Sequence, residues 1–249
     1  MIEVKNLYKS FGDKEVLKNI STMFEDGKTN LIIGQSGAGK TVLMRCVTGL
    51  MIPTSGEVLY DGRNFVNLKK KLQVQMRREM GMIFQSAALF DSQTVLENVR
   101  FPLDMFSNMT LRERQKRAME CLDRVNLTGA EDKFPGEISG GMQKRVAIAR
   151  AIVMKPKYLF CDEPNSGLDP KTSLVIDELL TDITHELNTT TIINTHDMNS
   201  VMGIGENIVF IADGRAEWQG DKESVMTAKN KKLNGLVFAS DLFKKVKEA

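Results

Sequence analysis

The chain has 249 residues, of which 42% are apolar and 27% charged, as expected of one large α/β domain or of one domain with an inserted lobe. Its formal net charge of only +2 excludes a strongly basic nucleic-acid binder, so we expect no nucleic-acid partner. The three cysteines are far apart and lack the spacing of a zinc site, which favours a reducing cytosol. Neither a secretion signal nor a run of roughly 18 apolar residues is found, so we expect any work at a membrane to require another chain.

The first part of the chain predicts a small antiparallel β layer. Ile2, Val4 and Leu7 roughly alternate with polar residues, and residues 56–65 predict two short strands around an Asp-Gly turn. Residues 29–34, TNLIIG, predict a buried strand. The segment that follows, GKTVLMRCVTGL, predicts a helix because its apolar residues recur at helical spacing.

The middle of the chain is polar and rich in helix formers. We expect a helical subdomain to be inserted here, over roughly residues 86–155. Within it, Thr110 and Glu113 have the spacing of a capping box, which predicts a helix running to about Val125.

Strands return in the second half of the chain. Three are predicted, at residues 157–163, 190–196 and 207–214. A helix between the first two has Asp169 as its N-cap and Pro170 at its first position. The order strand, helix, helical insert, strand, helix, strand favours a parallel sheet with crossover helices.

The end of the chain is separated from this pattern. We assign residues 1–224 to one domain and residues 225–249 to a short lysine-rich tail. We interpret the tail as a packing helix; an amphipathic contact with a partner is the alternative. Its apolar residues are Met226, Leu233, Leu236, Val237, Phe238, Leu242 and Phe243.

The segment GQSGAGKT, between a predicted strand and a predicted helix, matches the P-loop pattern G-x-x-x-x-G-K-[ST]. Its glycines let the backbone wrap around phosphate oxygens, and the helix N-terminus adds positive potential. We expect Lys40 to reach the β- and γ-phosphates and the Thr41 hydroxyl to bind Mg²⁺; a glycine turn with a solvated lysine is the alternative. The residues expected to hold nucleotide here are Gly34, Gln35, Ser36, Gly37, Ala38, Gly39, Lys40, Thr41 and Val42.

Acidic residues end the predicted strand YLFCDEP. We expect Asp162 to hold the Mg²⁺ shell, since magnesium takes few carboxylates, and Glu163 to polarise the attacking water as a general base. His196 ends the next strand, and parallel strands would bring it near the P-loop, where it can contact the γ-phosphate. Solvation at the strand end is the alternative for the acidic pair, and a histidine with its hydrogen bonds satisfied at a strand end is the alternative for His196.

A second anion-binding end is predicted in ISGGMQKRVAIARA. Ser139 is a natural N-cap, and Gly140 and Gly141 leave backbone N–H groups open to an anion. Nothing nearby supplies a second lysine or metal ligand. The economical arrangement is two copies packed head to tail, each helix end covering the other's γ-phosphate; an ordinary capped helix is the alternative.

These segments together resemble the nucleotide-binding subunits of ATP-binding cassette (ABC) transporters over about residues 1–220. GQSGAGKT matches the Walker A motif, YLFCDEP the Walker B motif, and ISGGM the signature motif. The resemblance implies an α/β P-loop NTPase: a RecA-like parallel sheet core with an N-terminal antiparallel β layer and the inserted helical subdomain. It also implies that the protein is an ATPase with ATP and Mg²⁺ as cofactors, that two ATP are held at a homodimer interface, and that integral-membrane permease subunits are partners.

The same resemblance implies roles for residues outside those three motifs. Gln85 matches the Q-loop glutamine, which touches Mg²⁺ and the transmembrane partner. Phe11 matches the aromatic residue that stacks on adenine. Asp169 ends the D-loop, SGLD (Ser166–Asp169), and is also counted among the nucleotide-binding residues. Met142 is the fifth residue of the signature, where many members have glutamine, and it is counted among the nucleotide-binding residues.

Two segments, FQSAALFDSQTVLENVRFPL and ISGGMQKRVAIARAI, resemble the ATPase of the Mla type (maintenance of lipid asymmetry). This resemblance implies a peripheral ATPase on the cytoplasmic side of the inner membrane. There it would power transport of phospholipid or a related lipid between bacterial envelope membranes, together with an Mce-type lipid-binding protein. The alternatives are the ATPase of an amino-acid-type or other small-solute importer, and a non-transport cassette ATPase such as one of cell division. A phosphate-binding scaffold without turnover is disfavoured by the pair Asp162 and Glu163.

Overall fold

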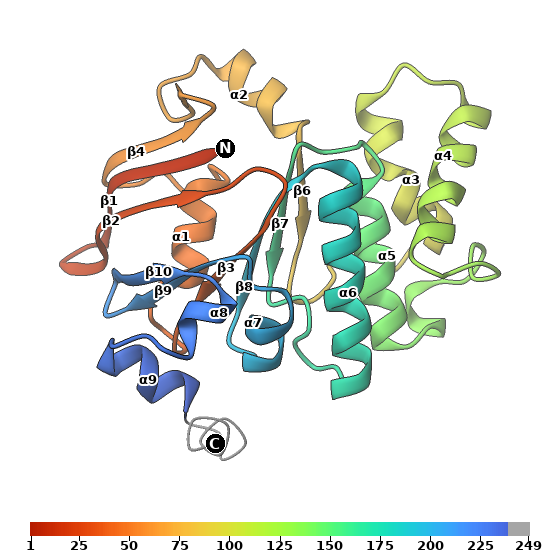
Figure 1. Cartoon of the computed structure of the whole chain (residues 1–249). Coiled ribbons are helices and arrows are strands. Elements are labelled where there is room, and N and C mark those ends of the chain that lie inside the picture. The colour runs from red at the N-terminus through yellow and green to blue at the C-terminus, as the bar shows by residue number, and fades with distance from the viewer. Residues whose placement is uncertain (239–249) are drawn as a thin grey trace.

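A six-stranded sheet forms the centre of the computed structural model, which describes residues 1–238 (Figure 1). The strand order is β10-β9-β3-β8-β7-β6; the strands from β9 to β6 are parallel, and β10 pairs antiparallel with β9. The strands are β3 (Thr29–Ile33), β6 (Met80–Ile83), β7 (Tyr158–Asp162), β8 (Thr190–Thr195), β9 (Asn207–Ala212) and β10 (Arg215–Gly220). The predicted parallel sheet is confirmed, and it gains two strands, β6 and β10, that the sequence pattern did not predict.

The start of the chain forms a second sheet, which confirms the predicted antiparallel layer. Its order is β2-β1-β4-β5, and every pair is antiparallel. The strands are β1 (Ile2–Phe11), β2 (Lys14–Phe24), β4 (Ser55–Tyr60) and β5 (Arg63–Asn64). The register sets Ile2 opposite both Phe24 and Tyr60, and all three side chains are buried in the core between the two sheets.

Helices cover both faces of the central sheet. Helix α1 (Lys40–Val47) packs between the two sheets, and the larger helices lie on the opposite face (Figure 1). The other helices are α2 (Lys70–Arg77), α3 (Val95–Phe106), α4 (Leu111–Arg124), α5 (Gly140–Ile152), α6 (Pro170–Leu187), α7 (Met198–Ile204), α8 (Lys222–Val225) and α9 (Lys231–Val237), with a 3₁₀ turn at Pro135–Glu137.

Burial on both faces explains why the central strands are continuous apolar runs. Along β3, Leu31 and Ile33 face the core beneath the large helices, whereas Ile32 faces α1 and the N-terminal sheet. All three are fully buried, and burying each side chain stabilises the fold by about 1.5–3 kcal/mol. The N-terminal layer and the helices therefore depend on the same strands.

The sheet brings the predicted site segments together. Strands β3, β8 and β7 are neighbours and run parallel, so their carboxyl ends meet at one edge. The P-loop follows β3, Asp162 ends β7, and His196 follows β8. In open α/β sheets this edge is where ligands bind.

The middle and the end of the chain pack on the helical side of the sheet. Helices α3, α4 and α5 share one apolar core, and Thr110 forms the predicted capping box with Glu113 at the start of α4. In the tail, Leu233 and Val237 of α9 are fully buried in that core, so the packing interpretation is confirmed for the described part. Leu242 and Phe243 lie outside the described residues.

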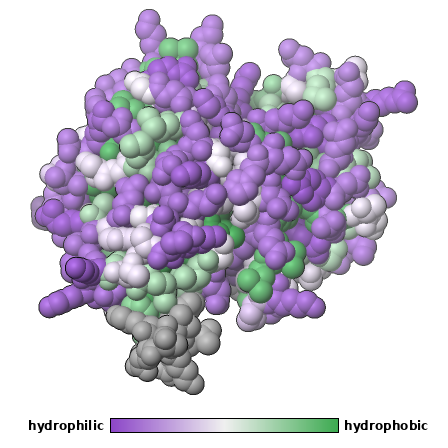
Figure 2. Space-filling model, in the orientation of Figure 1, coloured by the Kyte–Doolittle hydropathy of each residue, from purple (hydrophilic) through white to green (hydrophobic). Residues whose placement is uncertain are grey.

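The face of the molecule in Figure 2 is largely hydrophilic, and apolar residues gather only in small patches. In the part of the chain up to residue 238, every helix falls short of the length or the apolar character that crossing a membrane would require.

Candidate functional site

All three glycines of the P-loop, Gly34, Gly37 and Gly39, have a positive φ, and at two of them a Cβ would also lie too close to other atoms. Gly34 has a φ of +152°, and a Cβ there would lie 2.2 Å from the carbonyl oxygen of Ile211. Gly39 has a φ of +108°, and a Cβ there would lie 2.9 Å from Cδ2 of Leu17. At Gly37, by contrast, a Cβ would project into open space, with no atom within 4 Å. The loop therefore packs against β9 and β2 at its two ends and has open space beside its middle, as a phosphate-binding loop requires.

Lys40 lies buried at the mouth of this loop. Its side chain donates hydrogen bonds from Nζ to the carbonyl oxygens of Gly34 (2.8 Å) and Gln35 (3.2 Å). Burial lowers the pKa of Lys40, and the negative charges of Glu163 and Asp162 oppose that shift. A buried ammonium with only neutral partners gains much from a polyanion, because the anion restores the solvation that burial removed.

The residues predicted to hold Mg²⁺ fit that ion in part. Thr41 and Asp162 are neighbours, with the Thr41 hydroxyl 3.3 Å from Oδ1 of Asp162. The same carboxylate oxygen accepts a hydrogen bond from Nδ2 of Asn194 (2.9 Å), which orients it. A hydroxyl and a carboxylate are the hard oxygen ligands that Mg²⁺ prefers, and phosphates and water complete such a shell. Gln85 hydrogen-bonds elsewhere in this structure, so its metal role stays a prediction.

Glu163 has an unusual backbone, which aims its carboxylate at the site. Its φ is +50°, a left-handed conformation that non-glycine residues rarely adopt and that costs about 1–3 kcal/mol. The strain is held in place because its N–H donates to the carbonyl oxygen of Asn194 (3.0 Å). Oε1 then lies 3.2 Å from Nδ1 of His196, whose side chain is 62% exposed. The two residues predicted separately, as base and as γ-phosphate contact, are thus in contact with each other.

The Q-loop and the D-loop meet at the same carboxylate. Nε2 of Gln85 donates to Oε2 of Glu163 (3.3 Å) and to the hydroxyl of Ser166 (3.1 Å). Further along the D-loop, Asp169 caps α6 and is exposed, and its Oδ1 accepts from the N–H of Thr172 (3.1 Å). One amide side chain therefore joins the general base candidate to the loop that follows it.

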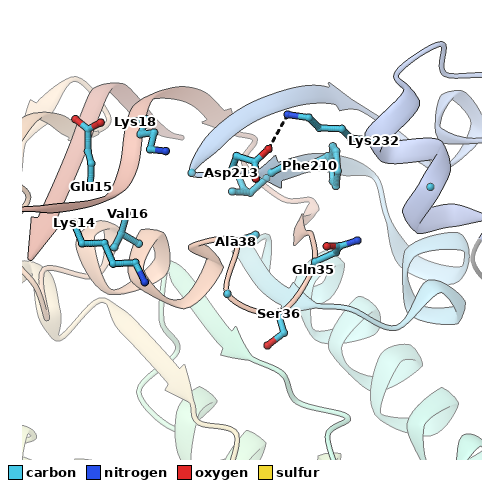
Figure 3. A pocket seen from close by; sticks show the side chains of 15 residues that line it. Lys14, Glu15, Val16, Lys18, Gln35, Ser36, Ala38, Phe210, Asp213 and Lys232 are labelled. Carbon is cyan, nitrogen blue, oxygen red and sulfur yellow. Dashed lines mark hydrogen bonds and ion pairs between the residues drawn. The ribbon is translucent and has the colours of Figure 1, made fainter.

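A cavity of about 620 Å³ lies on the β9 side of the P-loop, opposite to β7 (Figure 3). It is lined by P-loop residues 35–38, by Val16 of β2, by the end of β9 and by Lys232 of α9. The cavity leaves room for the nucleoside of a ligand whose phosphates lie in the loop. Phe11 does not line it; the ring is 49% exposed at the end of β1, so its stacking on adenine stays a prediction. Val42 packs instead against the core between the two sheets.

The second predicted anion-binding end has the expected local structure. Ser139 is the N-cap of α5, and its hydroxyl accepts a hydrogen bond from the N–H of Met142 (3.3 Å). Ser139 and Gly140 are exposed, while a Cβ on Gly141 would lie 2.9 Å from Thr172 of α6. Within residues 1–238, no hydrogen bond joins this end to the P-loop. A single chain therefore presents two separate open ends, and anion binding at both stays a prediction.

Three polar residues around the site were given no role by sequence reasoning. The hydroxyl of Ser166 accepts from Gln85, Asn194 donates to Asp162, and Lys144 of α5 donates to the backbone of Gln85. Asn194 could have been noticed, because it is an amide inside the apolar strand TTIINT. Lys144 gave no signal, since a lysine within a helix is expected to be solvated.

The comparisons with known proteins agree with this geometry. The family described as "ABC transporter" matches residues 17–166, more than half of the chain. The chain therefore belongs to the ABC transporter family, as an ATP-binding cassette.

Two curated relatives define its similarity further. The chain is 38% identical to the methionine import ATP-binding protein MetN of Clostridioides difficile, over 95% of this chain and 74% of that protein. It is 36% identical to the probable ribonucleotide transport ATP-binding protein mkl of Mycobacterium leprae, over 91% of this chain and 65% of that protein. The chain thus spans about two thirds to three quarters of the length of these relatives.

Two solved structures share the fold. One is a dimeric post-hydrolysis state of the ATP-binding cassette MJ0796 bound to ADP and Pi, with a TM-score of 0.81 and 34% identity over 89% of this chain and 99% of that one. The other is cbiO1 from Clostridium perfringens, part of the ABC transporter complex cbiONQ, with a TM-score of 0.85 and 31% identity over 100% of this chain and 98% of that one.

These findings confirm the predicted fold class and the coarser part of the predicted function. The chain is a P-loop ATPase that binds ATP with Mg²⁺ and is the ATP-binding subunit of an ABC transporter. Cassettes of this family dimerise and work with membrane permease subunits.

Proposed function

We propose that two copies of this chain hold two ATP between them, each bound by the P-loop of one copy and by the Ser139 end of the other. The observation that supports this arrangement is the separation of the two anion-binding ends within one chain. Ser139 and Gly140 are exposed, yet they lack a charged partner among the described residues. In a dimer, the helix N-terminus at Ser139 of each chain would contact the triphosphate bound in the P-loop of the other chain. The same contact would cover the phosphate in that P-loop.

In this arrangement the residues of one chain divide the work of hydrolysis. Lys40 would leave its two carbonyl partners and pair with the β- and γ-phosphates, while Thr41 and Asp162 would hold Mg²⁺. An ion held there would neutralise charge on those phosphates. The water oxygen would bond to the γ-phosphorus while the bond from this phosphorus to the β–γ bridging oxygen breaks and ADP leaves. Glu163 would take up the proton of this water at a carboxylate oxygen, and His196, 3.2 Å from it, would keep that carboxylate oriented and face the γ-phosphate.

We propose that the membrane partner docks in an apolar groove beside the Q-loop. The groove has a volume of about 500 Å³ and is lined chiefly by apolar side chains from α2, β6, the Q-loop, α3 and α5; Arg77, Arg78 and Arg150 also line it. Two of its aromatic residues, Phe90 and Phe101, pack with ring centroids 4.7 Å apart and ring planes tilted by 54°, and Phe90 stays 41% exposed. Exposed aromatic surface of this kind fits the apolar face of a helical segment from an integral-membrane permease. Residues 86–155 would then form the subdomain that contains part of the groove lining and α5, the helix that begins with the signature motif.

We propose lipid as the cargo, and the Mla type as the transporter. The supporting observation is that one segment resembling this type, FQSAALFDSQTVLENVRFPL, is also the segment that contributes Phe84, Phe90, Phe101 and Pro102 to the groove. The residues that resemble lipid transport ATPases are therefore those that would contact the permease. The complex would act on the cytoplasmic side of the inner membrane, with an Mce-type lipid-binding protein as a further partner.

Import of a small solute is the second candidate. It is favoured by the relatives named for methionine import, one of which, from Carboxydothermus hydrogenoformans, is 42% identical to this chain over 223 residues. Methionine and phospholipid require different membrane partners, so the two proposals are separable by experiment.

The test is to purify the chain with its native membrane partners and to identify bound molecules by mass spectrometry. An unrelated membrane complex purified in the same detergent is the control. We expect phospholipid to be enriched over the control, and ATP hydrolysis to respond to added phospholipid but not to L-methionine. Stimulation by L-methionine without lipid enrichment would support the small-solute importer instead.

A further inference from the structure

Helix α5 carries a buried lysine that contacts the Q-loop of its own chain. Lys144 is only 6% exposed, and its Nζ donates a hydrogen bond to the carbonyl oxygen of Gln85 at 2.5 Å. Burying an ammonium is costly unless it is paired, so a lysine here requires a specific partner. Burial lowers the pKa of Lys144, and the negative charge of Glu163 opposes that shift, so the ammonium lies within the electric field of this carboxylate.

A second cation of α5 fixes the next residues of the Q-loop. Arg150 donates to the carbonyl oxygens of Ala87 (2.7 Å) and Ala88 (2.8 Å). Both alanines have left-handed backbones, with φ of +60° and +49°. Since L-residues rarely adopt this conformation unaided, the loop depends on α5 for its shape.

These contacts connect the two ends at which nucleotide would bind. Ser139 is the N-cap of helix α5, and in the proposed dimer it covers the nucleotide of the other chain. Five residues further along the helix, Lys144 contacts the backbone of Gln85, and the amide of Gln85 contacts Glu163 in the site of its own chain. A shift of α5 on closure at one site would therefore move the group that orients the general base candidate of the other.

We propose that Lys144 is a positioning residue that couples the two ATP sites of the dimer. It does so because its hydrogen bond makes the position of Gln85 depend on the position of α5, the helix that begins with the signature motif. This inference rests on the proposed two-chain site. It differs from a purely structural contact in its consequences. Lys144→Met leaves the carbonyl oxygen of Gln85 without its donor, so loss of a purely structural lysine would lower the melting temperature but leave the cooperativity between the two sites unchanged. Loss of a coupling lysine would also reduce that cooperativity.

The experiment compares Lys144→Met, Lys144→Arg and the matched control Arg145→Met. Arg145 is the next residue of α5 and also donates to backbone carbonyls, those of Asn126 (2.8 Å) and Val125 (3.3 Å), but it faces away from the Q-loop. For each variant, the rate of ATP hydrolysis is measured as a function of ATP concentration. Nucleotide affinity is measured with a fluorescent ATP analogue, and the melting temperature is measured by calorimetry.

We expect Lys144→Met to lower kcat about tenfold or more, to keep nucleotide affinity within about twofold, and to reduce the Hill coefficient towards 1. Lys144→Arg should retain kcat within about threefold, since it keeps a charged donor. Arg145→Met should match the wild type in kcat and Hill coefficient. If Lys144→Met does not fold, Lys144→Gln, which is uncharged and shorter, carries the same test.

Unchanged kcat and Hill coefficient in Lys144→Met would overturn the coupling role, as would equal losses in Arg145→Met. Failure of the two-chain site itself is distinguished by Glu163→Gln. If that variant does not dimerise with ATP, the proposed function fails. If it dimerises while Lys144→Met behaves as wild type, only the coupling inference fails.

Discussion

Replacing Glu163 by glutamine separates a chemical role of this residue from a positional one. The carboxylate makes two contacts: Oε1 lies 3.2 Å from Nδ1 of His196, and Oε2 accepts from Nε2 of Gln85 at 3.3 Å. Glutamine has nearly the same size as glutamate. Its carbonyl oxygen can accept one of these two hydrogen bonds, but its NH₂ group cannot accept the second one.

The two roles predict different magnitudes. Loss of one hydrogen bond changes the free energy by about 0.5–1.5 kcal/mol, so a purely positional Glu163 would lower kcat by about tenfold at most. Loss of a general base lowers the rate by about 10²–10⁴-fold, or about 2.7–5.5 kcal/mol. We therefore expect kcat of Glu163→Gln to fall at least about 100-fold, with ATP binding retained.

The assay is steady-state ATP hydrolysis, combined with light scattering after gel filtration in ATP and Mg²⁺. Because binding persists while hydrolysis is slow, the variant should accumulate as a dimer. The matched control is Glu178→Gln, an exposed carboxylate on α6, which should hydrolyse ATP as the wild type does. A decrease of tenfold or less in Glu163→Gln would remove this residue from the role of general base.

Three further changes test other parts of the account. Lys40→Ala should abolish nucleotide binding or turnover, because the P-loop loses its only buried cation within the described residues; unchanged hydrolysis would remove the cradle assignment. Ser139→Arg should lower the rate of turnover by at least about tenfold while a single chain still binds ATP, because the arginine side chain would occupy the position of the γ-phosphate bound to the other chain. Normal turnover would contradict the shared site. Asp61→Asn should lower the free energy of unfolding by about 1 kcal/mol at pH 7, a figure reduced for partial solvent exposure. Burial would raise the pKa of Asp61, but hydrogen bonds from Lys157, the N-terminal amine and Tyr158 hold it well below 3.8. This stabilisation is present above about pH 4 and lost as pH falls further, so urea titrations of the two proteins should converge in acid; a difference independent of pH would exclude the ionised carboxylate as its source.

The parallel sheet could be predicted because its inner strands are apolar on both faces. Tyr158–Asp162 and Thr190–Thr195 are continuous apolar or β-branched runs that end in polar residues. The two strands that were missed lie at the edges of the sheet. Arg215–Gly220 is polar and pairs on one side only, and Met80–Ile83 is four residues long, so neither carries a sufficient pattern.

The site could be predicted as a set of motifs but not as a set of contacts. Gly34, Lys40 and Asp162 could be named as candidates because phosphate chemistry restricts which residues can stand at these positions. The contact between Glu163 and His196 depends on the left-handed backbone conformation of Glu163. No sequence pattern at a strand end predicts that conformation. Lys144 was missed for a different reason, since its burial arises only when α5 packs against the Q-loop.

The central claim is that each ATP is held between two chains. The most direct measurement is the structure of Glu163→Gln with ATP and Mg²⁺ bound. We predict a two-fold dimer in which the phosphates contact residues 34–41 of one chain and residues 139–142 of the other. A structure in which each triphosphate is enclosed by a single chain, with Ser139 still exposed to solvent, would contradict the claim.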